Sequence, residues 1–76
     1  MNTIQAQWLS YLRDVVPRDA GPVQVEECRR AFYAGAAGLL SITSTVIPYM
    51  DEDAGVAVLE GLHQELQGFA VAVGRA

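Results

Sequence analysis

Two proline-marked turns divide the 76-residue chain into three segments, and each segment repeats its apolar residues at helical spacing. The turns lie at Pro17–Pro22 and Pro48–Asp53. Proline removes a backbone donor and restricts the residue before it, so a helix stops at such a turn, and Pro22 can itself begin the next helix. The pattern predicts helices over residues 3–16, 22–47 and 54–73.

The apolar positions of the first and third segments each fall on one face of a helix. In the first they recur at steps of three and four, and in the third they alternate as in a coiled coil. Asn2 or Thr3 can cap the first helix, and the acidic residues 51–53 suit the start of the third, where the helix dipole favours negative charge. We expect one all-α domain over residues 1–76, with a short N-terminal helix and a long antiparallel helical hairpin. The apolar positions are Ile4, Trp8, Tyr11, Leu12 and Val15 in the first helix and Gly55, Leu59, Leu62, Leu66, Phe69 and Val73 in the third.

Hydrophobic residues make up 51% of the chain, more than so small a domain readily buries. The surplus is largely alanine and glycine, arranged as a line of small residues on each of the two long predicted helices. Glycine inside a helix costs about 1 kcal/mol relative to alanine, so these lines indicate places where another helix backbone comes close. They predict a homo-oligomer. The predicted interface residues are Ala34, Gly35, Gly38, Ala57, Gly61 and Gly68.

The formal net charge is −4, and every basic residue other than the single histidine is an arginine. Binding to a nucleic-acid polymer needs an excess of positive charge, so the composition argues against such a partner. Residues 31–50 carry no charge, and a stretch of that length can cross a membrane. Against a span, serine and threonine crowd residues 41–45, Pro48 shortens the helix, and the acidic flanks lack a Lys/Arg bias. The N-terminus also lacks a basic region followed by an apolar run. We therefore expect a cytoplasmic protein without a membrane partner.

Patterns for catalysis and metal binding are weak. One cysteine, Cys28, and one histidine, His63, cannot complete a zinc site or form an internal disulfide. No Gly-x-Ser-x-Gly turn presents a nucleophile, and no phosphate-binding glycine loop is present. The acidic residues 51–53 lack the ligand spacing of an EF-hand. The sequence therefore predicts no enzyme activity, no metal and no cofactor.

The segment Glu26–Tyr33 combines charged and aromatic residues on one predicted helix. Arg29 and Tyr33 share a face, where a guanidinium group can hold a phosphate and a ring can stack on a base. The same residues also fit a plain helix surface, because Glu26 can pair with Arg29 and Arg30, and aromatic side chains at helical spacing usually belong to a core. The spacing leaves both interpretations open. The candidate ligand-binding residues are Arg29, Arg30, Tyr33, Trp8, Thr43 and Ser44.

A short motif carries a resemblance to a known group of proteins. Residues 27–36 read Glu-x-Arg-Arg-Ala-Phe-Tyr-Ala-Gly-Ala, and the chain also contains Trp8-x-x-Tyr11 and a leucine-rich seam over residues 59–69. Together these segments resemble small accessory proteins encoded by tailed phages and prophages. The resemblance implies a protein that acts in the cytoplasm of the host cell by binding, and it brings no catalytic motif.

Three functions fit this resemblance. The leading hypothesis is a counter-defence protein that sequesters a nucleotide-derived host immune signal at the interfaces of its oligomer. Under this hypothesis the two arginines hold phosphates, Tyr33 or Trp8 stacks on a base, and Thr43 or Ser44 bonds a sugar or base edge. The alternatives are a protein-binding inhibitor or adaptor that masks a host factor, and a structural accessory protein without a ligand.

Overall fold

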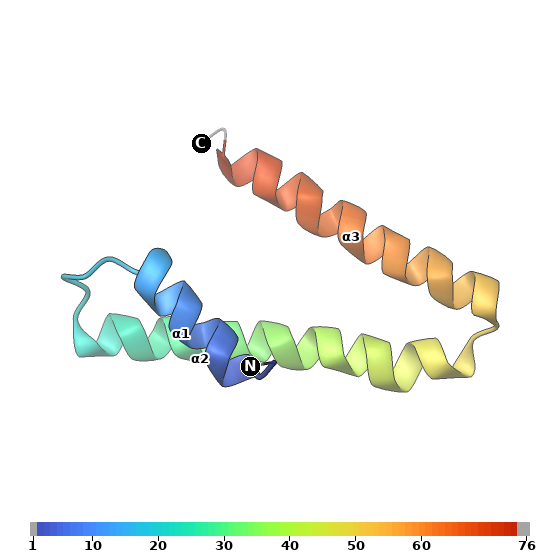
Figure 1. The fold of residues 1–76 in the computed structure, drawn as a ribbon, viewed down its shortest axis with the longest axis horizontal. Helices are drawn as coiled ribbons and strands as arrows, with labels where there is room; N and C mark the ends of the chain where they lie inside the picture. The colour runs from blue at the N-terminus through green and yellow to red at the C-terminus, as the bar shows by residue number, and fades with distance from the viewer. Residues whose placement is uncertain (1, 75–76) are drawn as a thin grey trace. The chain divides into compact units, whose positions relative to one another are not determined.

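A computed structural model of the chain describes residues 2–74, and these contain three α-helices and no strand. The all-α prediction is therefore confirmed. The chain divides into two compact units between Leu40 and Ser41. The single domain over residues 1–76, the antiparallel arrangement of the long helices and the oligomer stay predictions, and residues 1, 75 and 76 lie outside the described part. In chain order (Figure 1) the elements are α1 (Ile4–Asp14), α2 (Pro22–Ser41), the π-helix η1 (Ile42–Val46), the 3₁₀-helix η2 (Ile47–Tyr49) and α3 (Glu52–Gly74).

Helix α1 begins at a side-chain cap and ends before the first proline turn. The Thr3 hydroxyl accepts a hydrogen bond from the backbone N–H of Ala6 at 3.0 Å, which makes Thr3 the cap. The helix ends at Asp14, two residues before the predicted end at residue 16. Val16 precedes Pro17, whose ring disfavours helical backbone at that position. The closing hydrogen bonds run from the N–H groups of residues 15 and 16 to one carbonyl, that of residue 11, at 2.9 and 3.3 Å.

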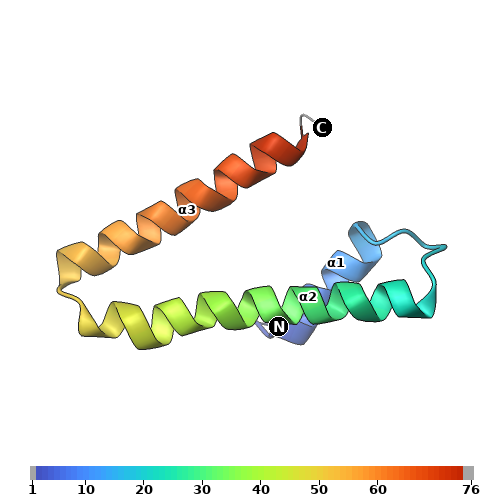
Figure 2. The same cartoon turned by 180° about the vertical axis from the view of Figure 1, so that it is seen from behind.

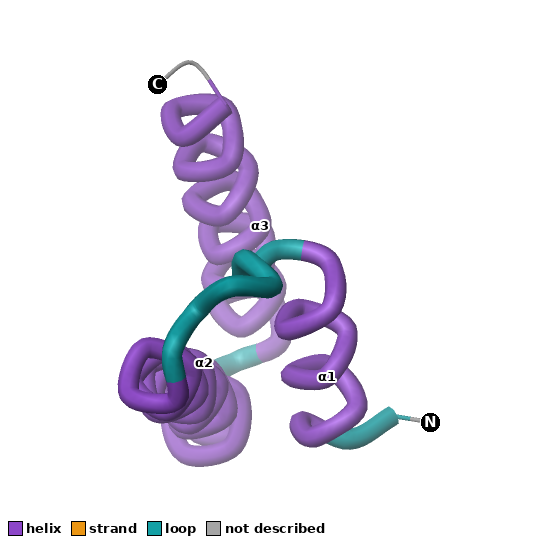
Figure 3. The backbone as a smooth tube through the Cα atoms, turned by 90° about the vertical axis from the view of Figure 1, so that its left-hand side faces the viewer, coloured by secondary structure: helices purple, strands orange, loops and turns teal. Residues whose placement is uncertain are grey.

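The first unit is held together by an aromatic cluster between α1 and α2, which lie against each other in Figures 1 and 3. The ring centroid of Phe32 lies 5.6 Å from that of Trp8 and 5.5 Å from that of Tyr11. Tilted ring pairs at such distances contribute about 0.5–1.5 kcal/mol beyond the area they bury. Trp8 is 4% exposed, and among the described residues it shares the hydrophobic core only with Val16. The position of α1 on α2 therefore depends mainly on these rings.

The second unit begins with an irregular helical segment that the sequence pattern did not predict. Regular α2 ends at Ser41, six residues before the predicted end at residue 47, and the chain continues through η1 and η2. Pro48 explains the change, because it lacks the N–H that would bond the carbonyl of residue 44 and its ring crowds that carbonyl. The Thr45 hydroxyl also donates a hydrogen bond to the carbonyl of Ser41, a local contact that bends helices.

Helix α3 begins at Glu52, two residues before the predicted start, because Asp51 provides its cap. The Asp51 Oδ1 atom accepts a hydrogen bond from the backbone N–H of residue 54 at 2.8 Å. Figure 2 shows the chain turning between η2 and α3. At this turn Gly55 is buried, and a Cβ atom placed on it would lie 3.2 Å from Cγ2 of Ile47. Residues 63–74 of the same helix are all exposed, including Phe69 at 70%.

Candidate functional site

Four side chains of α2 line a shallow depression of about 150 Å³. They are Glu26, Arg29, Arg30 and Tyr33, which we call the arginine cluster. Residues three and four positions apart are neighbours on a helix surface, so regular helix over this segment is enough to assemble the cluster. The structure thus brings together three of the six predicted ligand-binding residues. It adds Glu26, which the sequence pattern had identified only as a salt-bridge partner.

Glu26 is the anion of the cluster. Its Oε1 atom lies 3.6 Å from Nε of Arg30, and its Oε2 atom lies 3.9 Å from Nη1 of Arg29. Both separations exceed the 2.7–2.9 Å of a strong charge-assisted hydrogen bond. All three side chains are at least half exposed, so each pair contributes no more than a few tenths of a kcal/mol. Each guanidinium group has five N–H donors, so both retain donors for an added anion.

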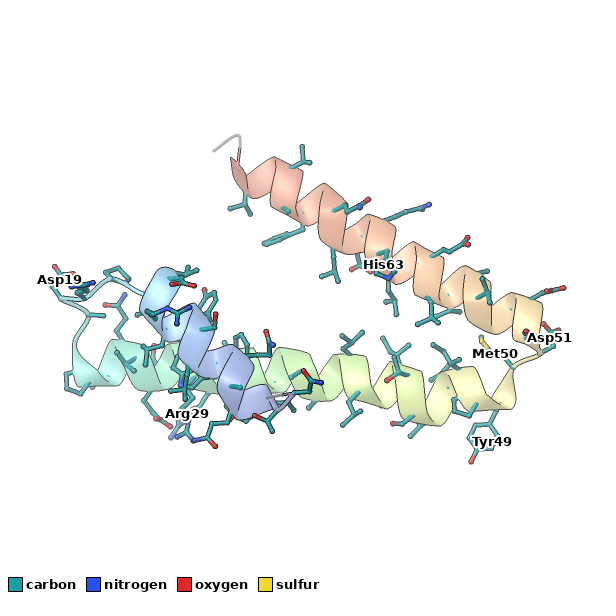
Figure 4. All side chains as sticks on the ribbon, viewed as in Figure 1. Asp19, Arg29, Tyr49, Met50, Asp51 and His63 are labelled. Atoms are coloured by element: carbon teal, nitrogen blue, oxygen red, sulfur yellow. The ribbon has the colours of Figure 1, made fainter. Side chains whose placement is uncertain are left out.

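Tyr33 forms the aromatic side of the depression. The Arg29 Cζ atom lies 5.5 Å from the centroid of the Tyr33 ring, within the range of a cation–π contact. The Tyr33 ring is half-buried and meets Phe32 edge-on, with the ring centroids 6.4 Å apart. In Figure 4, Arg29 lies along the lower side of α2. The cluster therefore presents two cations beside an aromatic ring that the core of the first unit supports.

The other predicted ligand-binding residues lie elsewhere. Trp8 is in the aromatic cluster and almost fully buried, so its ring faces are covered by protein. Thr43 and Ser44 belong to η1, in the second unit. His63 is an exposed residue of α3 (Figure 4). We therefore assign no ligand contact to Trp8, Thr43 or Ser44, and His63 was not among the predicted ligand-binding residues.

The predicted interface residues lie on open helix surface. A Cβ atom placed on Gly35, Gly38, Gly61 or Gly68 would have nothing within 4 Å. Ala34 and Ala57 are exposed. Within each of the two units, these glycines therefore do not serve a close approach between helices, and the contact with a second copy stays a prediction.

A larger groove lies between α1 and α2 within the first unit, and the sequence pattern gave no sign of it. It measures about 400 Å³ and is lined by Asn2, Thr3, Ile4, Gln7, Phe32 and Ala36. The lining depends on where α1 crosses α2, which no local spacing specifies.

Charge and hydropathy add three findings for the described residues. No group of three or more His, Cys, Asp or Glu residues is placed to hold a metal ion. A hydrogen bond from the Arg13 side chain holds the pKa of Asp14 below its ordinary value, and the pair lies on exposed α1 surface.

The helical stretch Pro22–Tyr49 is long and apolar enough to cross a membrane. One such helix is a weak indication, because core helices and signal sequences share these properties.

Comparison of the chain with protein-family models, with curated proteins and with solved structures finds no significant match. The resemblance to phage accessory proteins therefore stays a prediction.

Proposed function

We propose that the protein is a non-enzymatic binding protein that sequesters a nucleotide-derived signal at the arginine cluster. One observation carries the proposal: Arg29, Arg30 and Tyr33 surround a single depression. Guanidinium groups match the geometry of a phosphate, and a tyrosine ring offers a stacking surface for a base or sugar. The depression supplies two guanidinium groups, a carboxylate and a ring, which suit the binding of a phosphate and a base.

The charge distribution favours a small ligand over a nucleic-acid polymer. Two arginines can neutralise one or two phosphates, whereas a polymer would bring many more phosphates against a chain of net charge −4. Following the resemblance stated above, we propose that the signal belongs to host immunity and that the protein acts in the host cytoplasm as a phage counter-defence protein.

The size of the depression supports assembly between copies. Sites for small molecules usually measure roughly 300–1,000 Å³, about two or more times the volume of the arginine cluster. A second wall is therefore needed to enclose the phosphate end of a nucleotide. We propose that a second copy supplies it, with close contacts at the open glycines Gly35 and Gly38 of α2 and Gly61 and Gly68 of α3.

Calorimetric titration with a panel of cyclic and linear nucleotides tests the proposal. We expect one or more to bind, and we expect Arg29→Ala or Arg30→Ala to weaken binding about ten-fold or more, because a hydrogen bond to a charged group contributes about 1.5–3 kcal/mol. Arg18→Ala is the matched control, since Arg18 lies in the turn outside the cluster. The absence of binding across the panel by folded protein would refute the proposal.

A second candidate function has its own supporting observation. The acidic residues of the second unit are exposed, and residues 41–74 contain no arginine or lysine. Such a surface suits a protein partner with a basic face, where complementary charge raises the association rate. A stoichiometric host partner recovered from lysate would favour this masking function if its binding survived Arg29→Ala and Tyr33→Ala. Recovery of the protein in the membrane fraction would instead favour insertion of the stretch Pro22–Tyr49.

A further inference from the structure

We infer that the groove between α1 and α2 holds the base of the nucleotide whose phosphate lies at the arginine cluster. This inference rests on the proposed function, and it assigns the base of the ligand to a second set of residues outside the arginine cluster. The groove measures about 400 Å³, which is within the range of small-molecule sites, and it belongs entirely to the first unit.

The lining of the groove suits a flat, neutral ligand. None of its residues is charged, and its polar groups are the amides of Asn2 and Gln7 and the hydroxyl of Thr3. The Thr3 hydroxyl accepts one hydrogen bond as the cap of α1 and keeps its own O–H donor, and the two amides add further groups that can read a ligand. Each amide offers both a donor and an acceptor, the combination with which asparagine and glutamine pair with the edge of adenine.

Phe32 provides the stacking surface. It lines the groove, is half-buried, and is fixed by its contacts with Trp8 and Tyr11. A ring that is already held in place loses little freedom when a base stacks on it, and one such stack contributes about 1–3 kcal/mol. Ile4 and Ala36 complete an apolar floor.

The groove and the arginine cluster adjoin on α2, because consecutive residues of the helix line them. Phe32 lines the groove, Tyr33 lines the cluster, and the centroids of these two rings are 6.4 Å apart. A nucleotide that spans both would therefore place its ribose beside these two rings. An anion fits less well, because it would meet no cation in the groove.

Nuclear magnetic resonance with two fragments tests the inference, because each fragment carries one half of a nucleotide. Adenosine and guanosine lack phosphate, and we expect them to shift the side-chain amide of Gln7 and the ring of Phe32. Ribose 5-phosphate lacks a base, and we expect it to shift the Nε resonances of Arg29 and Arg30. Filling the groove by Ala36→Leu should weaken nucleoside binding at least ten-fold and leave the affinity for ribose 5-phosphate unchanged.

A second variant keeps the test decisive if Ala36→Leu does not fold. Gln7→Ala should weaken nucleoside binding about five-fold, the size of one hydrogen bond. Gln5→Ala, on the same helix but outside the groove lining, should have no effect.

The outcomes separate the inference from the proposed function. If ribose 5-phosphate binds at the arginines and nucleosides leave Gln7 and Phe32 unchanged, the inference is wrong and the phosphate site stands. If nucleosides bind in the groove and ribose 5-phosphate does not bind, the groove stands as a base site and the phosphate site is wrong. If neither fragment binds, both are overturned.

Discussion

Replacing Gly38 by alanine and by leucine tests whether this open glycine contacts a second copy of the chain or faces solvent. Nothing lies within 4 Å of a Cβ atom placed on Gly38, so the first unit on its own accepts either side chain. Alanine then gains about 1 kcal/mol of helix propensity, and leucine gains nearly as much. For a chain of this size the gain raises the melting temperature by roughly 4–8 °C.

In an assembly with closely packed helices the two substitutions differ in sign. A leucine forced into a tight contact costs about 1–3 kcal/mol, which corresponds to an association weakened roughly 5- to 150-fold. We therefore expect Gly38→Leu to shift the protein toward monomer, whereas Gly38→Ala keeps more of the assembly. Sedimentation velocity at tens of micromolar, with thermal melts at two concentrations, measures both effects.

Gly55→Ala is the internal control for this experiment. Its new Cβ atom would meet Ile47 at 3.2 Å, a contact inside the second unit, so its effect should not depend on protein concentration. The reasoning is refuted if the unsubstituted chain sediments as a monomer at tens of micromolar. It is also refuted if Gly38→Leu raises the melting temperature without changing association.

Three further predictions concern single side chains of the first unit. Trp8→Ala should lower the free energy of unfolding by about 3–5 kcal/mol and detach α1 from α2, because the ring is 4% exposed. Chemical denaturation followed by circular dichroism measures this loss, and an unchanged midpoint would contradict it. Glu26→Gln should raise the affinity for phosphate up to about five-fold at low salt and less at high salt, because it removes the anion that faces both arginines. Calorimetry measures this affinity, and weaker binding would instead place Glu26 in contact with the ligand. The pKa of Asp14 should lie below the ordinary range of an aspartate. Its contribution to stability is therefore present above the ordinary pKa and is lost as the pH falls through the lowered pKa. Carbon-detected titration should show this pKa returning to its ordinary value in Arg13→Gln.

Helix starts were largely predictable because their signals are local. Thr3 and Pro22 begin α1 and α2 as the sequence indicates, since a capping hydroxyl and a proline at the first helical position act within one turn. The start of α3 was predicted two residues late, because Asp51 and Asp53 can each cap a helix and the structure uses the first. The π-helical segment was missed, although Pro48 and the run of serine and threonine before it are the features that explain it.

Some features of the candidate site are set by local sequence, and others are set by how the helices pack. Arg29, Arg30 and Tyr33 could be placed together from the sequence because helical spacing alone fixes neighbours on one surface. A core position for Trp8 was one of the two interpretations that the sequence left open, but the rings that cover it and the groove beside Gln7 could not be predicted, because both depend on how α1 docks on α2. Helical periodicity identifies an apolar face without saying which element covers it.

Native mass spectrometry of protein purified from cells that make nucleotide immune signals tests the central claim most directly, because one spectrum reports subunit number and bound ligand together. We predict an oligomer that releases a nucleotide on denaturation, and a doubly substituted Arg29→Ala, Arg30→Ala protein that assembles without it. An unsubstituted protein that is monomeric and ligand-free, or a double variant that keeps the nucleotide, would contradict the claim.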